Sequence, residues 1–535
     1  MLARALAVCL GLGCLAGVGR SGLGADWPQW GGRDDRNMVS DEQGLPDSFK
    51  PGDKSPSGRG IDMATTDRVK WVARLGSAAY GNPTVARGRV FVGTDDQTVT
   101  DDPRFRRTQG GLVKCFDEAT GKLVWQLVIP KRTEVPKGLH YSFQHLGTLS
   151  SPTVDGDRVY VVTGAVELVC LDVRGQANGN DGPFKEEGQY MAGHGNPPVE
   201  LKPTDADILW RVDLMGELGV RVHDAASNSV LVHGDLVYLG TSNGVDGPHE
   251  RMVAPDAPAL AAFDKRTGRL AAVENEKISR RMYHCEWSSP SLGKVGGKTL
   301  LFFGGGDGAC YAFEALSKAP PKPAYLKKVW SYDCNPPHYK VRDGKPIPYY
   351  AGDKRKKNSP NKSDGQYVGP SQIIATPVFH ENRVYVALGQ DPAHGRGRGM
   401  LHCIDAAKTG DITRSGCIWT YDGIDRTIAT AAVAGGLVYL ADIGGRMHCV
   451  DADTGKPCWV YETKAETWGG PLVADGKLFF GNQKEFFVMA AGRTPKVLGR
   501  MHLGTPICST PIAANGVLYV ASQRYLWAVQ SVKKE

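Results

Sequence analysis

Beyond residue 25, the sequence has no apolar run long enough to cross a bilayer as a helix, which takes about 20 residues. It also has little excess of one charge, because 64 Lys and Arg stand against 57 Asp and Glu, for a formal net charge of +7. That balance gives no support to nucleic-acid binding. Glycine and proline, at 67 and 33 residues, are too few for a disordered chain but suit many tight turns.

The first 25 residues have the pattern of a secretory signal. Arg4 supplies the positive charge, residues 5–18 the apolar stretch, and Leu23-Gly24-Ala25 a small-residue cleavage site. We therefore expect a signal peptide at residues 1–25 and a secreted or periplasmic protein, in a compartment where disulfides can form.

A short phrase recurs along the chain, in which an acidic residue is followed by a Thr-Gly turn and a strand with Trp. Its clearest copies are KCFDEATGKLVWQLV from residue 114 and MHCVDADTGKPCWVYET from residue 447. Apolar residues alternate on both sides of an Asp-x-x-Thr-Gly turn, which is typical of a β-hairpin. Another hairpin phrase, such as GNPTVARGRVFVG from residue 81, precedes these and occurs eight times.

Two hairpins per copy make a four-stranded sheet, and sheets repeated every ~40 residues are the signature of a β-propeller. The last copy has no Trp-bearing fourth strand after Trp527, whereas VKWVARLG at 69–76 precedes the first copy. We predict an all-β, eight-bladed β-propeller of four-stranded antiparallel blades over residues 69–535. Strand 69–76 closes the ring as the outer strand of the last blade, and residues 26–68 form an N-terminal extension.

These residues resemble the pyrroloquinoline-quinone-like (PQQ-like) propeller repeat, from about Lys70 to Val532. The resemblance implies that the Trp of the phrase ties neighbouring blades, although Ala272 and Gly499 replace it in two of them. The Trp residues given this structural role are Trp71, Trp125, Trp210, Trp330, Trp419 and Trp459. The stretch DWPQWGG at 26–32 also resembles the start of secreted propellers from planctomycete-like bacteria.

The resembling family has members of two functional classes. Some are quinone-dependent dehydrogenases of alcohols or sugars, and others, similar to the lipoprotein BamB, bind protein without a cofactor. The alcohol-oxidising type would have adjacent cysteines under the quinone and a Glu/Asn/Asp set around Ca²⁺, and no Cys-Cys pair occurs here. We therefore favour a binding or scaffold module with no cofactor, no metal and no catalytic residue. A PQQ- and Ca²⁺-dependent oxidoreductase is the alternative.

The cysteines follow the repeat. Cys115, Cys170, Cys403 and Cys449 alternate with Ala at one repeat position, which is typical of packing in buried strands. Cross-strand disulfides remain an alternative. If the 452–455 loop has four residues, Cys449 faces Cys458, and Cys403 and Cys417 take the same places in a longer hairpin.

Residues that break the repeat are the candidates for function. Those just before the first strands are expected to ring the mouth of the central channel; they are His145, His223, Asp224, His284, Glu286, Trp287 and Trp468. Three His and two carboxylates on one axis could bind a metal or move a proton. They lack ligand spacing such as His-x-x-x-His, so we favour hydrogen-bonded channel residues.

Long insertions fall in connections that share one face of the propeller; they are 97–110, 127–147, 244–258, 333–370 and 391–400. Loops gathered on one face usually form the binding surface. The candidate anion-binding residues on this face are Lys354, Arg355, Lys356, Lys357, Arg396 and Arg398. They predict a protein partner or an anionic polysaccharide or other envelope component. The alternative interpretation is a set of solvated loops.

Overall fold

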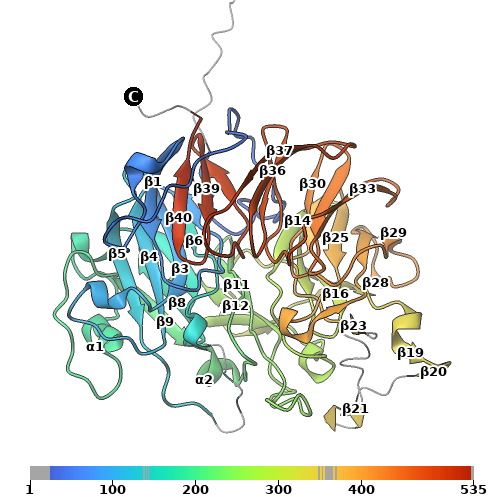
Figure 1. Ribbon diagram of the computed structural model, residues 1–535. Helices are drawn as coiled ribbons and strands as arrows, with labels where there is room; N and C mark the ends of the chain where they lie inside the picture. The colour runs from blue at the N-terminus through green and yellow to red at the C-terminus, as the bar shows by residue number, and fades with distance from the viewer. Residues whose placement is uncertain are drawn as a thin grey trace, which may run out of the picture.

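Eight sheets of four or five strands form the blades of the computed structural model. Figure 1 shows the blades from the side. The structure describes residues 25–136, 139, 141, 144–346, 350–351, 354–355, 366–367 and 370–531. Within them, each sheet begins with the first hairpin of a repeat and ends with the second. The predicted eight-bladed β-propeller is confirmed.

Successive hairpins supply the four strands of each blade. The first four blades contain β2 (Thr84–Ala86), β3 (Arg89–Asp95), β4 (Gly111–Asp117) and β5 (Leu123–Ile129); β6 (Thr153–Asp155), β7 (Arg158–Val162), β8 (Glu167–Asp172) and β9 (Ile208–Asp213); β10 (Leu231–His233), β11 (Leu236–Gly240), β12 (Leu260–Asp264) and β13 (Leu270–Val273); and β14 (Ser291–Val295), β15 (Lys298–Gly304), β16 (Ala309–Glu314) and β18 (Lys328–Asp333).

The last four blades contain β24 (Val378–His380), β25 (Arg383–Ala387), β27 (Leu401–Asp405) and β29 (Cys417–Tyr421); β30 (Ala432–Ala434), β31 (Leu437–Ala441), β32 (Arg446–Asp451) and β33 (Pro457–Glu462); β34 (Leu472–Ala474), β35 (Lys477–Gly481), β36 (Phe486–Ala490) and β37 (Val497–Met501); and β38 (Ile512–Ala514), β39 (Val517–Ala521), β40 (Tyr525–Val529) and β1 (Val69–Arg74).

Burial explains the composition of these strands. The second and third strands of a blade are covered on both faces by the neighbouring blades, so β31 and β39 are buried along their whole length and have continuous apolar sequences. The fourth strands lie at the rim and are less uniformly buried; in β1, buried residues alternate with half-buried ones.

The first strand of the chain closes the ring. β1 pairs antiparallel with β40, which places Trp71 opposite Ala528 and Val72 opposite Trp527. In Figure 1, β1 in blue accordingly lies beside β40 in red. The predicted closure is confirmed, and it pairs the outer edge that β40 would otherwise expose.

Two blades differ from the prediction of four strands, because each gains a short fifth strand. β17 (Ala324–Tyr325) pairs in parallel with β13, and β28 (Gly410–Asp411) pairs in parallel with β18. Both come from connections of the following blade. They pair with hydrogen-bonding groups on the outer edge of the blade. The repeat pattern alone does not predict these two strands.

The remaining elements lie in insertions. The helices are α1 (Glu187–Ala192), α2 (Leu214–Leu218) and the 3-10 turns η1 (Met63–Thr65), η2 (Val99–Asp101), η3 (Gln144–Leu146), η4 (Gly175–Asn178), η5 (Ile278–Arg280), η6 (Pro337–Lys340) and η7 (Pro392–His394). The short strands are β19 (Val341–Arg342), β20 (Lys345–Pro346), β21 (Tyr350–Ala351), β22 (Lys354–Arg355), β23 (Gln366–Tyr367) and β26 (Arg396–Gly397). None of the helices in the described ranges has the length and apolar character that a membrane span requires.

Tryptophans join neighbouring blades. Each indole Nε1–H of five of them donates to a backbone carbonyl in the next blade, at 2.8–3.1 Å. The pairs are Trp71–Glu118, Trp125–Val173, Trp330–Ala406, Trp419–Ala452 and Trp459–Gly492. Trp210 is also buried against the next blade, where a side chain at Gly268 would collide with its ring.

The register prediction for the cysteine pairs is wrong by one residue. A bulge after Cys449 places it opposite Trp459 rather than Cys458. The same irregularity puts Cys403 opposite Trp419, while Cys417 faces Ile404. All four are free thiols in the structure. The cross-strand disulfides stay an alternative. Cys403 and Cys449 are fully buried, in agreement with the packing interpretation.

The N-terminal extension forms a plug across the channel. Residues 27–40 hydrogen-bond to the first strand of every blade, or to the residue beside it. The contacts, in blade order, are Trp27–Val85, Pro28–Val154, Arg36–Val230, Asp34–Leu292, Asp35–Phe379, Asn37–Val433, Met38–Val473 and Ser40–Ala513. The extension therefore interacts with all eight blades at once.

Arg36 anchors the plug. Its fully buried guanidinium donates to the carbonyls of Val230 at 2.8 Å and Pro290 at 3.0 Å, in two different blades. Burial lowers the pKa of Arg36 to about 10, although the charges of Asp34 and Asp35 oppose this shift. The side chain therefore remains cationic at neutral pH, with its charge held by carbonyl oxygens.

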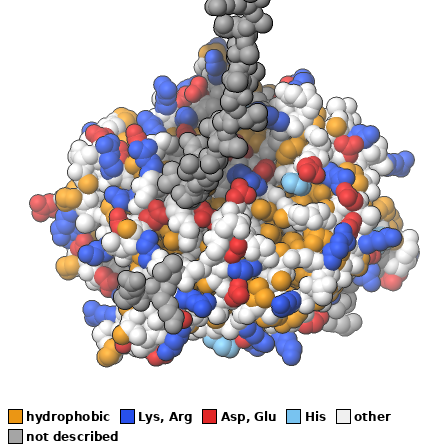
Figure 2. All heavy atoms as spheres, turned by 90° about the horizontal axis from the view of Figure 1, so that it is seen from above, with side chains coloured by type: hydrophobic (Ala, Val, Ile, Leu, Met, Phe, Trp, Pro, Cys, Tyr) orange, Lys and Arg blue, Asp and Glu red, His pale blue; other side chains and the backbone are white. Residues whose placement is uncertain are grey.

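Charge is distributed evenly over the end of the propeller that Figure 2 shows. Lys and Arg side chains are interspersed there with Asp and Glu, and neither sign gathers into a continuous patch among the side chains that the structure describes. The connections that contain α2 and β21 lie toward the opposite end in Figure 1.

Candidate functional site

A cavity of about 490 Å³ lies on the propeller axis at the mouth of the channel. Each blade contributes to its wall through residues just before its first strand; one from each blade is Tyr80, Leu149, Ser229, Ser289, Thr376, Thr430, Gly470 and Cys508. Trp30 of the plug also lines it. Its size is within the range of small-molecule sites, which is roughly 300–1,000 Å³.

Aromatic rings form part of the cavity wall. Tyr80 and Trp468 stack with their ring centres 5.9 Å apart, and the Trp468 indole donates to Glu466 at 3.2 Å. Trp287 is fixed by a 3.0 Å hydrogen bond to the Ala225 carbonyl. Burial raises the pKa of Tyr80 to about 12, so its phenol is neutral at physiological pH. The cavity thus presents flat apolar surfaces in a fixed orientation.

The polar side chains of the cavity are hydroxyls, carboxylates and the imidazole of His145. Among the described residues that line it, none is Lys or Arg, and the acidic ones are Asp391 and Glu466. Burial raises the pKa of Asp391 to about 6, and the nearby charge of Asp224 adds to that shift. A neutral or cationic ligand suits this lining better than an anion does.

Three imidazoles gather at the edge of this mouth. The Nε2 of His249 lies 2.8 Å from the Nε2 of His223 and 3.3 Å from the Nε2 of His284. His223 and His284 are fully buried or nearly so. They come from three successive connections, before β10, between β11 and β12, and between β13 and β14. We call these three residues the histidine cluster.

Contacts of the Nδ1 atoms fix the ring orientations within the cluster. The Nδ1 of His223 lies 2.8 Å from the carbonyl of Val245, which can only accept, so this nitrogen carries the proton. The Nδ1 of His284 lies 3.1 Å from the Cys285 sulfur. The Nε2 of a neutral His223 therefore presents a lone pair to the other two rings.

A further loop borders the histidine cluster. The His394 ring lies 4.8 Å from the His284 ring and 5.0 Å from the His249 ring, between ring centres. Asp391, His394 and His284 also have ligand atoms within 4.8 Å of one another. The buried Arg426 holds this loop through Gln390 and the Gly395 carbonyl.

The structure brings together some of the predicted channel residues and separates others. His223, Asp224 and His284 meet at the cluster, and Trp287 lies beside it, with its ring 5.4 Å from that of His284. Trp468 lines the cavity, as does the exposed His145.

Glu286 is not part of the cluster. Its carboxylate accepts a 2.7 Å hydrogen bond from the backbone of Gly306. Burial, with the charge of Asp307, raises the pKa of Glu286 well above its usual value. The side chain therefore has a structural position, and it is protonated more readily than an exposed glutamate.

Sequence analysis missed His249, Asp391 and His394. They lie in the insertions 244–258 and 391–400, whose place on the mouth face was predicted but whose path in space was not. The signal for His249 and His394 was a His within a repeat-breaking insertion, whereas His223 and His284 were selected because each precedes a first strand.

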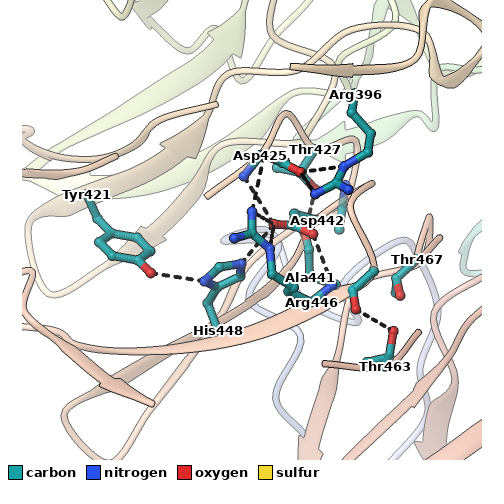
Figure 3. A network of polar contacts seen from close by, with 12 residues as sticks. Arg396, Tyr421, Asp425, Thr427, Ala441, Asp442, Arg446, His448, Thr463 and Thr467 are labelled. Carbon is teal, nitrogen blue, oxygen red and sulfur yellow. Dashed lines mark hydrogen bonds and ion pairs between the residues drawn. The ribbon is translucent and has the colours of Figure 1, made fainter. Parts of the chain in front are cut away.

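The predicted anion-binding residues are placed differently from one another. Figure 3 shows Arg396 paired with Asp425, at 2.7 Å, within a network that also includes Arg446 and Asp442. Arg398 is exposed on the same loop. Arg396 is therefore neutralised locally and is a weak candidate for binding an external anion.

The remaining basic run is described only in part. Lys354 and Arg355 form β22, whereas Lys356 and Lys357 lie outside the described residues. Anion binding by this run stays a prediction.

Two segments of the chain, residues 109–280 and 398–498, match the model of the family described as outer membrane protein assembly factor BamB. Together they make up slightly more than half of the 535 residues. The chain belongs to this family. The predicted PQQ-like repeat is thereby confirmed.

Two solved structures show a distant similarity to this BamB-family chain. BamB from Moraxella catarrhalis is 12% identical, covers 86% of this chain and 97% of its own, and has a TM-score of 0.47. A europium-containing methanol dehydrogenase is 14% identical, covers 93% and 89%, and has a TM-score of 0.45. Such low identities carry no information on ligand or activity.

One curated relative matches a short part of the chain. The lanthanide-dependent methanol dehydrogenase of Methylacidiphilum fumariolicum (strain SolV) is 32% identical over 105 residues. The match spans 18% of this chain and only 17% of the length of that relative. Its activity therefore does not carry over to this BamB-family protein.

The cavity does not fit the quinone cofactor that the PQQ-like resemblance implies. Pyrroloquinoline quinone carries several carboxylates, which need cationic partners, and the described lining residues include neither Lys nor Arg. Ca²⁺ prefers oxygen ligands, whereas the side chains that converge beside the cavity are four imidazoles and the single carboxylate of Asp391. We assign no role to a quinone in this BamB-family chain.

Proposed function

We propose that this protein is a binding module whose channel cavity holds a neutral saccharide of one or two rings. The observation that carries the proposal is the wall of stacked Tyr80 and Trp468, with Trp287 also on the wall, in a cavity to which all eight blades contribute. Flat aromatic surfaces contact the apolar faces of sugar rings.

The polar lining supports the same ligand. Hydroxyls of Ser229, Ser289, Thr376 and Thr430, and the carboxylate of Glu466, line the cavity and can exchange hydrogen bonds with sugar hydroxyls. Since the lining residues include the carboxylates of Asp391 and Glu466 and neither Lys nor Arg, uronic acids and other anions should bind less well.

Fluorescence and calorimetric titrations with maltose and cellobiose test this proposal, with digalacturonic acid as the charged counterpart. We expect saturable binding of at least one neutral disaccharide and weaker binding of the acid. Trp468→Ala should weaken binding at least about tenfold, which corresponds to about 1.4 kcal/mol. Tyr325→Ala is the matched control, because Tyr325 is an aromatic residue that is 67% exposed and does not line the cavity.

Two results would overturn the saccharide proposal. One is the absence of binding by both neutral disaccharides. The other is binding by the Trp468→Ala variant with unchanged affinity, which would mean that the stacked pair makes no contact with the ligand.

Membership of the BamB family supports a protein partner in addition, together with a secreted or periplasmic location. Both remain proposals for this chain. An anionic polysaccharide is not proposed, because Arg396 is paired within the protein and the cavity lining is acidic. Replacing Lys354 to Lys357 by Ser and measuring partner binding at several salt concentrations tests the remaining basic run.

A further inference from the structure

We propose that the histidine cluster is a binding site for one divalent transition-metal ion, with the Nε2 atoms of His223, His249 and His284 as its ligands. The site goes beyond the saccharide proposal and does not depend on it. It is separate from the blade scaffold, because its three residues come from connections and from no strand.

The spacing of the nitrogens fits a metal. At metal–nitrogen distances of about 2.0–2.1 Å, two ligands lie about 3.3 Å apart at the tetrahedral angle and about 2.9 Å apart at a right angle. The distances between the Nε2 atoms are 3.3 Å for His249–His284 and 2.8 Å for His223–His249. The remaining pair, His223 and His284, has ligand atoms within 4.8 Å of each other, so an ion could bind once the rings adjust.

Hydrogen bonds among the three imidazoles account for this arrangement less well than a bound metal ion does. The Nε2 of neutral His223 has a lone pair, because its Nδ1 donates to the Val245 carbonyl. One proton on the Nε2 of His249 can point at only one of its two neighbours. A cation at the centre is instead approached by all three lone pairs.

The surroundings resemble the outer shell of a metal site. A ligating histidine almost always donates its other N–H to a carbonyl or carboxylate, as His223 does with Val245. The Asp224 carboxylate lies 3.4 Å from the His223 Nε2 and brings negative charge to the site. Both groups would favour a bound cation.

The ligand atoms indicate the class of metal. Imidazole nitrogen suits Zn²⁺, Cu²⁺, Ni²⁺ and Co²⁺, whereas Ca²⁺, Mg²⁺ and lanthanides prefer oxygen. Three protein ligands leave at least one coordination position for water or another ligand. Asp391 lines the cavity and has a ligand atom near His284, so the cluster adjoins the cavity at this residue.

His394 is not one of the proposed metal ligands. The Gln390 amide donates to its Nδ1 at 3.0 Å, because the amide oxygen of Gln390 accepts from Arg426. The Nε2 of neutral His394 then carries the proton and is a hydrogen-bond donor rather than a metal ligand. We assign it to the surroundings of the metal.

The experiment uses the full chain purified without an affinity tag of histidines and freed of metal by a chelator. Zn²⁺ is titrated by calorimetry and Co²⁺ by visible absorption, which reports coordination number and nitrogen ligation. We expect one ion per chain. Zn²⁺ should also raise the melting temperature, because it binds only the folded state.

Two variants remove ligands with little risk to the fold. His249→Asn is the first choice, because His249 has a φ of +57° and Asn tolerates that conformation. His284→Gln is the second. Loss of an outer-shell partner costs 10–100-fold in metal affinity, so loss of a ligand should cost more than about 100-fold. His145→Ala is the matched control, since His145 is exposed and lies on the cavity wall outside the cluster.

The proposal is overturned if the wild-type chain takes up no stoichiometric Zn²⁺ or Co²⁺. It is also overturned if His249→Asn and His284→Gln, with metal-free melting temperatures like that of the wild type, bind metal unchanged. Trp468→Ala should keep metal binding and lose saccharide binding, so failure of either proposal can be recognised separately.

Discussion

At the scale of single residues, Asp442 shows how a charge is kept inside this propeller. Its carboxylate is fully buried and accepts hydrogen bonds from His448 at 2.9 Å and from Arg446 at 3.0 Å (Figure 3). Burial by itself raises the pKa of Asp442, but the bonds and charges of His448 and Arg446 outweigh it and hold the pKa below its usual value.

This shift predicts the direction of a pH effect. Because the folded pKa of Asp442 is below the unfolded one, its contribution to stability is complete above about pH 4 and is lost as the pH falls through the folded pKa. Asp442→Asn should lower the free energy of unfolding at pH 7 by about 2 kcal/mol or more. It should also flatten the decline in stability below pH 4, measured by denaturant unfolding at several pH values.

The neighbouring Asp422 supplies the control for this prediction. It is exposed, so Asp422→Asn should change stability little at any pH. An Asp442→Asn variant with wild-type stability at pH 7 would contradict the role given to the buried network.

The sequence was also a poorer guide to the individual residues of the site than to the fold. His223 and His284 could be found because each precedes a first strand, and the repeat fixes where such residues lie. His249 and His394 could not be paired with them, because the path of a long insertion depends on local contacts such as those of Arg426 with Gln390.

At the scale of elements, docking between blades depends on Trp side chains at the rim. The Nε1–H of Trp125 donates to Val173 in the next blade, whereas the Nε1 of Trp210 has no hydrogen-bond partner within the described part of the chain. The two side chains occupy the same repeat position and are both buried. They therefore form a matched pair.

Replacing each with Phe separates the hydrogen bond from the packing. Trp125→Phe leaves the Val173 carbonyl without this donor and should cost about 1–3 kcal/mol more than Trp210→Phe in denaturant unfolding. The reduction in side-chain volume is the same for both. Equal losses would show that packing alone, and not the hydrogen bond, holds neighbouring blades together.

Element boundaries were largely predictable from sequence, and register was not. Alternating apolar residues around Gly- and Asp-rich turns located all eight first hairpins. The bulge after Cys449 shifts the strand pairing by one residue and leaves no mark in the sequence pattern, so counting residues could not predict that Cys449 lies opposite Trp459.

At the scale of the whole molecule, two segments of the chain keep the propeller ring closed. β1 completes the last blade, and the plug of residues 27–40 contacts all eight blades. The first was predictable, because a missing fourth strand at one end of the chain matched an extra strand at the other. The second was not, because DWPQWGG and the residues after it have no period that relates them to the blades.

Two truncated chains distinguish the roles of β1 and the plug. A chain that starts at residue 42 lacks the plug but keeps β1, so the ring should stay closed and melt in one transition at a lower temperature. A chain that starts at residue 77 also lacks β1, which exposes the edge of β40 to other molecules. We expect this second chain to melt over a wider range and to self-associate in size-exclusion chromatography. If both truncated chains melt alike and stay monomeric, β1 does not close the ring in the way its pairing with β40 implies.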